Sequence, residues 1–215
     1  MTDDTLPPCI HVVDDDAHFL RSVLFLIQGL GFEAVGYPSA EDFLQATPAP
    51  VPQGCCLLLD IRMPRMSGLE LQRRLLEQTA TESMPIVFMT GHGDVDQAVQ
   101  ALRSGAADFL QKPFSEQTLL DALNRAVAAS VQAQRQQARQ AQALQVLQRL
   151  TPRERDVARL LALGHSNKEV ARVLDISDHT VHVHRQGITR KIGSGHAADL
   201  ARLILRAAPQ ELDED

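Results

Sequence analysis

Short apolar runs alternate with longer, helix-like stretches along the first 125 residues of the chain. Four runs of four or five residues are rich in Val, Ile, Leu and Cys, and they lie at 9–13, 55–59, 85–89 and 107–110. Runs of this length and composition predict buried strands. Because stretches long enough for helices separate them, the pattern predicts a parallel sheet of the α/β class.

A polar residue that can bind a ligand or react with one stands just after each run. Asp14 and Asp15 follow the first run, and Asp60, Thr90 and Lys112 follow the others. Ligands of open α/β sheets bind beyond the carboxyl ends of the strands, so we expect these side chains to converge. Three carboxylates brought together repel one another unless one is protonated or a hard divalent cation lies between them, and Mg²⁺ suits such a site.

The same residues suit phosphoryl transfer. An aspartate can attack phosphorus and form an acyl phosphate, while a metal ion, a hydroxyl and an ammonium neutralise charge on the equatorial oxygens. Asp60 is the predicted nucleophile because it is single and central in the set. Taken singly, each residue keeps a second interpretation, since Asp at a strand end is often only a helix cap or turn former. A proline after Lys112 also permits a cis peptide bond there.

Four motifs surround these residues. They are VVDDD at 12–16, LLLDIRMPRMSG at 57–68, MTGHGD at 89–94 and FLQKPF at 109–114. With these motifs, residues 9 to about 125 resemble the receiver domain of two-component response regulators, in particular its FixJ branch. The resemblance implies a flavodoxin-like, doubly wound parallel sheet with the strand order 2-1-3-4-5.

The resemblance also assigns roles to residues of this chain. It implies a phosphoacceptor, Asp60; metal ligands for Mg²⁺, namely Asp14, Asp15, Asp60 and the backbone carbonyl of Arg62; and phosphoryl-binding or switch residues, namely Thr90, Lys112 and Phe109. Phe109 stands where the family has its switch aromatic, and as phenylalanine it can pack inward or outward but has no hydroxyl. The implied phosphoryl donor is a sensor histidine kinase.

The second half of the chain carries two capping boxes, TPRE at 151–154 and SNKE at 166–169. In such a box the hydroxyl side chain accepts from the N3 amide, and the glutamate accepts from the cap residue's own amide. Ser177 is expected to cap a third helix that runs to about Ile192, and a fourth helix spans about 197–207. Short helix, tight turn and helix together predict a helix-turn-helix.

A helical plot of the third helix separates two faces. Val181, Ile188 and Ile192 share the face expected in the core, with His184 at its border. The opposite face presents His182, Val183, Gln186 and Arg190. Gln suits adenine, Val suits a thymine methyl, and Arg suits guanine or a phosphate. Gly187 either permits close approach to DNA or is a tolerated surface defect of this helix.

This half resembles the four-helix, LuxR/NarL-type DNA-binding domain. The resemblance rests on LTPRERDV at 150–157, GHSNKEVA at 164–171, LDISDHTVHVH at 174–184 and ITRKIG at 188–193. It implies a recognition helix of about 178–192 in the major groove, usually in a dimer on inverted half-sites. The expected DNA contacts are His182, Val183, Arg185, Gln186, Arg190 and Lys191. A lysine is common in such families where His182 stands.

The predicted organisation is a receiver at 1–129, a helical linker at 130–149, the DNA-binding domain at 150–208 and an acidic, disordered tail at 209–215. The linker is rich in Gln, Ala and Arg and lacks Gly and Pro, so it favours one continuous helix from about 116 to 150. A flexible glutamine-rich tether is the alternative, because isolated polar helices are only marginally stable in water.

Charge divides with the domains. Residues 1–129 carry 8 Lys and Arg against 17 Asp and Glu, whereas residues 151–206 carry 10 against 6, within a net charge of -6 for the whole chain. A basic second half is suited to a polyanion. There is no run of 18 apolar residues and no signal peptide, so we expect a cytoplasmic protein without a membrane partner.

These inferences predict a transcription regulator controlled by phosphorylation. A histidine kinase would supply the phosphoryl group, and a homodimer would bind double-stranded promoter DNA and contact RNA polymerase. The receiver would catalyse its own phosphorylation without being a conventional enzyme. A phosphohydrolase or phosphotransferase that uses aspartyl phosphate usually has Asp-x-Asp, whereas Ile61 and Arg62 follow Asp60. A third possibility is a DNA-binding protein whose receiver responds to a partner and not to phosphorylation. The intact acidic pair, Thr90 and Lys112 argue against it.

Overall fold

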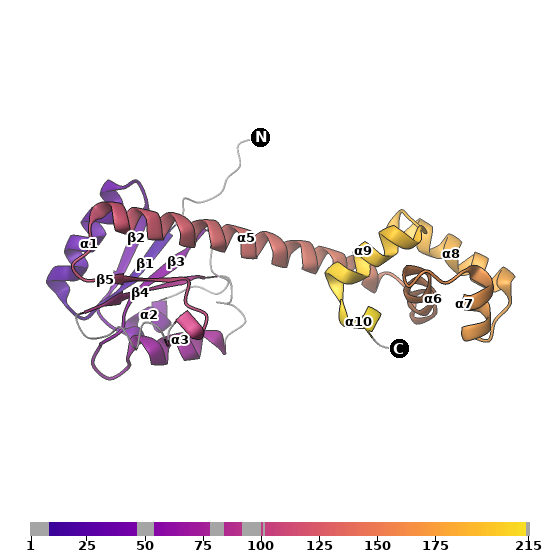
Figure 1. The fold of residues 1–215 in the computed structure, drawn as a ribbon, viewed down its shortest axis with the longest axis horizontal. Helices are drawn as coiled ribbons and strands as arrows, with labels where there is room; N and C mark the ends of the chain where they lie inside the picture. Colours follow the sequence, from indigo (N-terminus) through magenta and orange to yellow (C-terminus); the bar gives the residue numbers. More distant parts are fainter. Residues whose placement is uncertain (1–8, 47–53, 78–83, 92–99, 101, 214–215) are drawn as a thin grey trace. The chain divides into compact units, whose positions relative to one another are not determined.

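The chain forms two compact units, one up to Gln134 and one from Arg135 onward. They are seen in a computed structural model that describes residues 9–46, 54–77, 84–91, 100 and 102–213 (Figure 1). Among the described residues, no helix combines the length and the apolar character needed to cross a bilayer.

The first unit is a five-stranded parallel sheet flanked by helices. Its elements are β1 (Cys9–Val13), α1 (Ala17–Gly29), β2 (Glu33–Tyr37), α2 (Ala40–Ala46), β3 (Cys56–Asp60), α3 (Gly68–Leu76), β4 (Ile86–Thr90), β5 (Asp108–Gln111) and the start of α5 (Glu116–Gln148). The strand order is β2-β1-β3-β4-β5, and every neighbouring pair is parallel. The expected flavodoxin-like order is confirmed, and β1 and β3 flank the point where the order reverses.

Four of the five strands lie within one residue of the ranges predicted from apolar runs. The run pattern did not predict β2, and only the family resemblance implied it. β2 pairs with β1 alone and alternates exposed with half-buried positions until Tyr37. Such an edge strand lacks the continuous apolar run that marks a strand buried on both faces.

Two hydrophobic layers enclose the sheet. On one side, Leu20 and Ile27 of α1 and Leu123 of α5 pack with alternate strand residues such as Leu58. On the other side, Phe43 of α2 and Leu71 of α3 pack with the remaining strand residues. Figure 1 shows α1 and α5 on one face and α2 and α3 on the other. Successive side chains of a strand point to opposite faces of the sheet, so the wholly buried β3 contributes side chains to both layers. This burial fixes the register in which β3 pairs with its neighbouring strands.

The second unit is helical. Its elements are α6 (Pro152–Ala162), α7 (Asn167–Val173), α8 (Asp178–Ile192), α9 (Ala197–Ala207) and α10 (Gln210–Asp213). Both predicted capping boxes are formed, by Thr151 with Glu154 and by Ser166 with Glu169. Val181 and Ile188 of α8 are fully buried in the core of this unit, as the helical plot predicted.

The acidic tail differs from its prediction. Residues 210–213 form α10 instead of a disordered segment. The Arg155 guanidinium pairs with the Glu211 carboxylate at 2.5 Å, and Arg159 Nε donates to the Glu211 carbonyl oxygen at 2.8 Å. Leu212 packs against the core of the unit. Two arginines of α6 and one apolar contact offset the entropy that ordering this segment costs, and charge composition alone did not reveal those partners.

α5 is one unbroken helix of 33 residues. The boundary between the two units falls within it, after Gln134. Leu119 and Leu123 of its first part belong to the receiver core, and Ala143 and Leu147 of its last part belong to the core of the second unit.

Candidate functional sites

The carboxyl edge of the sheet gathers two buried acids and one base. Asp14 follows β1 and Asp60 ends β3, with only 1% and 7% of their surfaces exposed. Lys112, one residue after β5, donates from Nζ to Asp14 Oδ2 at 2.6 Å and to Asp60 Oδ1 at 2.5 Å. The Lys112–Pro113 peptide bond is cis. Three residues from three strands therefore meet at the point where the strand order reverses.

Burial and hydrogen bonding act on the pKa of Asp60 and on that of Lys112. Burial raises the pKa of Asp60, while the hydrogen bond from Lys112 and the Arg62 amide act against this. Burial alone would lower the pKa of Lys112, but hydrogen bonds to Asp14 and Asp60 outweigh it and the pKa is raised. Two carboxyl groups face one ammonium here, and such a surplus of acidic groups suits a further cation.

The three consecutive aspartates of the β1–α1 loop differ in what they contact. Asp14 Oδ1 accepts from the Asp16 amide at 3.0 Å, and Asp15 is exposed. Asp16 is the N-cap of α1, and its carboxylate accepts from the His18 and Phe19 amides at 2.8 and 3.1 Å. The capping role that the sequence left open for each aspartate thus falls to Asp16, which leaves Asp14 and Asp15 available as oxygen ligands.

Thr90 and Phe109 lie on neighbouring strands. Thr90 ends β4, is 3% exposed, and its hydroxyl donates to the carbonyl oxygen of Leu110 on β5 at 3.4 Å. On β5, Leu110 is buried while Phe109 is 37% exposed, so Phe109 takes the outward of its two expected orientations. The His-Gly-Asp end of the MTGHGD motif, 92–94, lies outside the described residues.

The loop after β3 brings backbone against the Asp60 main chain. The Arg62 amide donates to Asp60 Oδ2 at 2.8 Å, and the Gly68 amide donates to the Ile61 carbonyl at 3.0 Å. A Cβ on Gly68 would lie 2.2 Å from the Asp60 carbonyl oxygen, so only glycine fits. The sequence pattern does not mark Gly68 as a constrained position, although the Ser67 cap before it marks the turn into α3.

One aromatic ring borders the Lys112 ammonium, and a second ring packs against the first. Lys112 Nζ lies 4.1 Å from the centroid of the Phe19 ring. Phe114 meets Phe19 edge-on, with centroids 5.9 Å apart. Neither ring was predicted as part of the site, because each also fits an ordinary amphipathic position and only the tertiary fold brings Phe19 to Lys112.

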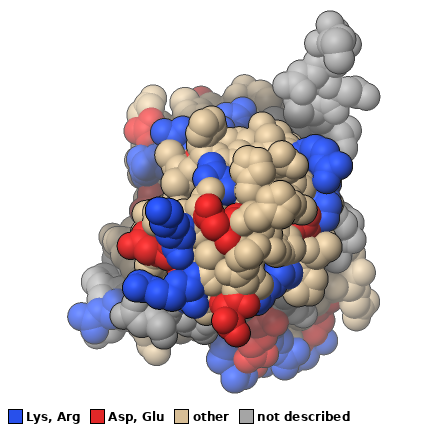
Figure 2. Space-filling model, turned by 90° about the vertical axis from the view of Figure 1, so that its right-hand side faces the viewer, with Lys and Arg blue, Asp and Glu red and all other residues tan. Residues whose placement is uncertain are grey.

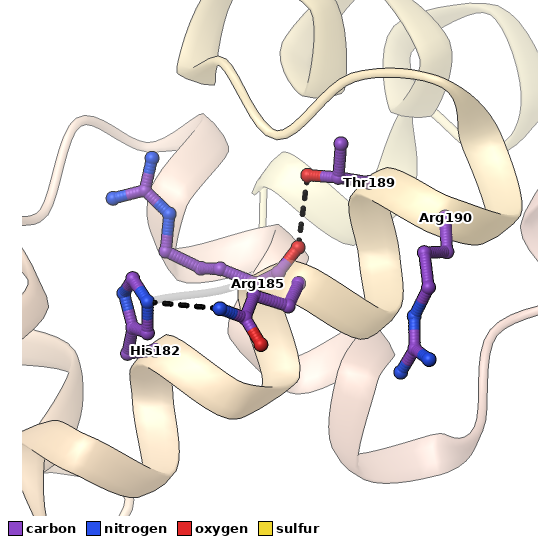
Figure 3. Close-up of a pocket in the computed structure, with 5 residues that line it drawn as sticks. His182, Arg185, Thr189 and Arg190 are labelled. Atoms are coloured by element: carbon purple, nitrogen blue, oxygen red, sulfur yellow. Dashed lines mark hydrogen bonds between the residues drawn. The ribbon is translucent and has the colours of Figure 1, made fainter.

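The recognition helix α8 presents four of its six predicted DNA contacts to solvent. The exposed four are His182, Val183, Gln186 and Arg190. His182 Nε2 and Gln186 Nε2 are 3.1 Å apart and hydrogen-bonded, one helical turn from each other (Figure 3). Residues of this helix line an open groove of about 670 Å³, namely His182, Arg185, Gln186, Thr189 and Arg190.

The other two predicted contacts have partners inside the domain. Arg185 donates to Asn167 Oδ1 of α7 at 2.8 Å and to the Gly195 carbonyl at 3.2 Å. Lys191 Nζ lies 2.5 Å from Glu154 Oε2 of α6. Arg185 also lines the groove described above, so these partners within the domain do not test the expected DNA contacts of Arg185 and Lys191, which stay predictions.

Gly187 is buried rather than at the surface. A Cβ there would lie 2.4 Å from Glu154 Oε1. Burial would raise the pKa of Glu154, but hydrogen bonds from Lys191 and Thr151 lower it overall. Gly187 therefore makes room for the Glu154 carboxylate, and both earlier interpretations of it, close approach to DNA and a surface defect, are wrong.

The surface around α7 and α8 carries both signs of charge. In the foreground of Figure 2, Lys and Arg side chains surround several Asp and Glu side chains. Figure 3 shows the Arg185 and Arg190 guanidinium groups pointing in different directions from α8. Among the described residues of this face, basic side chains thus lie among acidic ones and do not form a single basic patch.

Comparison with known proteins adds to this geometry. Residues 10–124 match the family described as the response regulator receiver domain, and residues 148–204 match the luxR family of bacterial regulatory proteins. The chain is a member of the response regulator family. Its combination of a receiver with a LuxR-type DNA-binding domain is that of a two-component response regulator of transcription.

Relatives of this response regulator match over nearly the whole chain. The response regulator protein TodT of Pseudomonas putida is 38% identical over 92% of this chain and 85% of its own length. Transcriptional regulatory protein FixJ of Bradyrhizobium diazoefficiens is 38% identical over 92% and 95%. The solved structure of response regulator StyR aligns with a TM-score of 0.77 at 38% identity, covering 93% of this chain and 98% of that one. Full-length FixJ of B. japonicum aligns with a TM-score of 0.57 at 38% identity, covering 94% and 97%.

Proposed function

We propose that a sensor histidine kinase transfers a phosphoryl group to Asp60 and that the phosphorylated homodimer binds promoter DNA through α8. The observation that carries the proposal is the pairing of Lys112 with both Asp14 and Asp60 at the carboxyl edge of the sheet. A structural ion pair would need one carboxylate for one ammonium. Two buried carboxylates on one ammonium leave an uncompensated charge, which a metal-dependent phosphoryl site uses.

The donor set fits Mg²⁺, which prefers carboxylate oxygens, carbonyl oxygens and water. Asp14, Asp15 and Asp60 with the Arg62 carbonyl would hold the ion, and it would supply neutralisation of charge on the transferring group. An Asp60 carboxylate oxygen attacks phosphorus, the bond from phosphorus to the kinase histidine breaks, and an acyl phosphate forms on Asp60. Lys112 already lies beside the attacked position and neutralises charge as it develops there.

The Thr90 hydroxyl then couples the site to β5. It now donates to the Leu110 carbonyl, and a phosphoryl oxygen on Asp60 would compete for that proton. Turning of the hydroxyl toward Asp60 would release the backbone next to Phe109, and its partly exposed ring would move inward. The changed surface around β5 would favour the homodimer, which places two recognition helices on DNA.

On DNA, we assign base reading to Gln186 and Val183 and a phosphate or guanine contact to Arg190, with His182 beside Gln186. Arg185 and Lys191, which also have partners within the domain, are the remaining proposed DNA contacts. The bound dimer would then contact RNA polymerase. The catalysis in this proposal is that of the receiver on itself, namely phosphoryl transfer to Asp60 and its later hydrolysis.

The test uses acetyl phosphate with Mg²⁺ on the full chain. We expect one phosphoryl group per chain, on Asp60, and none on the Asp60→Asn variant, because asparagine is nearly isosteric but lacks the nucleophilic carboxylate. Mass spectrometry of the intact chain and of its peptides measures the label. Selection of DNA from a random pool, with and without beryllofluoride, tests the second domain. Label that persists on another residue of Asp60→Asn would refute the assignment.

A further inference from the structure

The Lys112 ammonium has an aromatic neighbour that the proposed phosphorylation chemistry does not use. Besides the two carboxylates, the ammonium faces the Phe19 ring, with 4.1 Å between Nζ and the ring centroid. The side chain of Lys112 is 21% exposed. Two carboxylates and one ring therefore surround most of the cation.

Local structure fixes where this ring lies. Phe19 is in the first turn of α1, and its amide donates to the N-cap carboxylate of Asp16 at 3.1 Å. The edge of the Phe114 ring meets it at an interplanar angle of 82°. A capped backbone and an edge-to-face neighbour leave the Phe19 ring little freedom to turn away from the ammonium.

The contact is electrostatic as well as steric. The face of an aromatic ring carries partial negative charge and attracts a cation within about 6 Å of its centroid. Unlike a carboxylate, the ring does not repel an incoming phosphoryl group strongly and does not compete as a metal ligand. It can therefore keep Lys112 near Asp60 when the hydrogen bonds to Asp14 and Asp60 are exchanged for phosphoryl oxygens.

We propose that Phe19 is a positioning residue for Lys112, which holds the ammonium where the phosphoryl group on Asp60 needs it. The inference rests on the proposed function of Asp60. A cation–π contact of the usual strength corresponds to about a 2- to 30-fold change in an equilibrium constant.

Two measurements on the full chain test the proposal. The first is nuclear magnetic resonance of the metal-free protein with labelled lysine, in which only Lys112, Lys168 and Lys191 contribute. The ring should shift the Lys112 methylene protons upfield, and Phe19→Leu should abolish that shift. The second is a calorimetric titration with beryllofluoride and Mg²⁺, a stable substitute for the phosphoryl group. Phe19→Leu should raise its dissociation constant about 2- to 30-fold.

Matched variants separate positioning from simple packing. Phe19→Tyr keeps a ring and should retain both the upfield shift and affinity within about 2-fold of the wild type. Phe25→Leu makes the same exchange on the same helix, but Phe25 is 80% exposed and absent from the site, so both signals should stay unchanged.

The outcomes distinguish the two proposals. Absence of the Lys112 shift in the wild type, or equal affinity of wild type and Phe19→Leu, overturns the role of Phe19 alone. Equal losses in Phe19→Leu and Phe19→Tyr also overturn it, because they indicate packing rather than the ring face. If the wild type does not bind beryllofluoride and Asp60 takes no label, the proposed function fails and this inference with it.

Discussion

At the residue scale, Gly187 determines how close α8 lies to α6. The Glu154 carboxylate occupies the space where a side chain would be, and Lys191 and Thr151 hold that carboxylate. We expect Gly187→Ala to lower stability by about 1 to 3 kcal/mol, the usual cost of overpacking. Thermal unfolding measures the change.

The matched control for this substitution is Gly29→Ala, at the end of α1. A Cβ there meets no atom within 4 Å, and the backbone is helical. Alanine should be neutral at this position, or stabilising by up to about 1 kcal/mol, through helix propensity. If Gly187→Ala is as harmless as Gly29→Ala, Glu154 moves aside freely and the fit at Gly187 is not a constraint.

Also at this scale, substitutions of Gln186 and Arg190 should change DNA affinity in different ways. Gln186→Ala should relax preference at one base pair by about 1 to 3 kcal/mol, because a bidentate base contact is lost. Arg190→Ala, if Arg190 meets phosphate, should weaken all sequences alike and reduce the salt dependence. Affinities for the selected DNA and its single-base variants, measured at several salt concentrations, separate the two. Unchanged base preference in Gln186→Ala would remove that residue from base reading.

Single residues were predictable where geometry leaves little choice. The carboxyl ends of parallel strands meet at one edge, so the meeting of Asp14, Asp60 and Lys112 followed from their places after apolar runs. The ring of Phe19 was missed because it meets Lys112 across segments distant in sequence, and the fit of Gly68 was missed because it depends on how closely the loop after β3 returns to the Asp60 carbonyl. Hydrophobic periodicity reports which face of an element is buried but not which atom it meets there.

At the scale of elements, an ion pair ties the recognition helix to α6. Glu154 is 7% exposed, caps α6 by accepting from the Thr151 amide at 2.7 Å, and pairs with Lys191 of α8. The pKa of Glu154 is lowered, so its contribution to stability is present above the pKa of an unfolded glutamate, about 4.3, and is lost as pH falls through the lower folded value.

It follows that Glu154→Gln should cost stability at pH 7 and cost much less in strong acid. Glutamine can still accept a hydrogen bond but cannot pair with an ammonium. Unfolding of the variant and the wild type between pH 3 and pH 7 measures the difference, and the two curves should approach each other on acidification. Glu169→Gln alters the other capping box, where hydrogen bonds from Ser166 lower the pKa of the carboxyl group, so this control reports the pH dependence of capping alone. A pH-independent difference would contradict a charged role for Glu154.

In the second unit, the sequence predicts the ends of the helices better than it predicts which of their faces are buried. The two capping boxes and the Ser177 cap mark helix starts directly in sequence, and α8 ends at the expected Ile192. The plotted face of α8 found Val181 and Ile188, yet it did not show that Gly187 is buried as well. A single apolar stripe describes a helix against one neighbour, whereas α8 packs on both α6 and α7.

At the scale of the whole molecule, chemistry and charge are divided between the two units. The acidic residues lie mostly before residue 130, and residues 151–206 carry the basic excess. A phosphorylation event in the first unit must therefore alter DNA affinity in a unit whose core it does not share. α5 is the covalent element common to both, and its polar middle contains neither glycine nor proline.

We therefore expect helix continuity in α5 to matter for coupling. Replacing Gln136 and Gln137 by glycine should lower the helical circular dichroism signal, because each glycine costs about 1 kcal/mol relative to alanine in a helix interior. It should also shrink the gain in DNA affinity that beryllofluoride produces. The same two residues replaced by alanine keep the length and phase of the helix, so that variant should retain the gain. A flexible tether predicts no difference between the two variants, and equal coupling in both would rule out a role for the continuous helix.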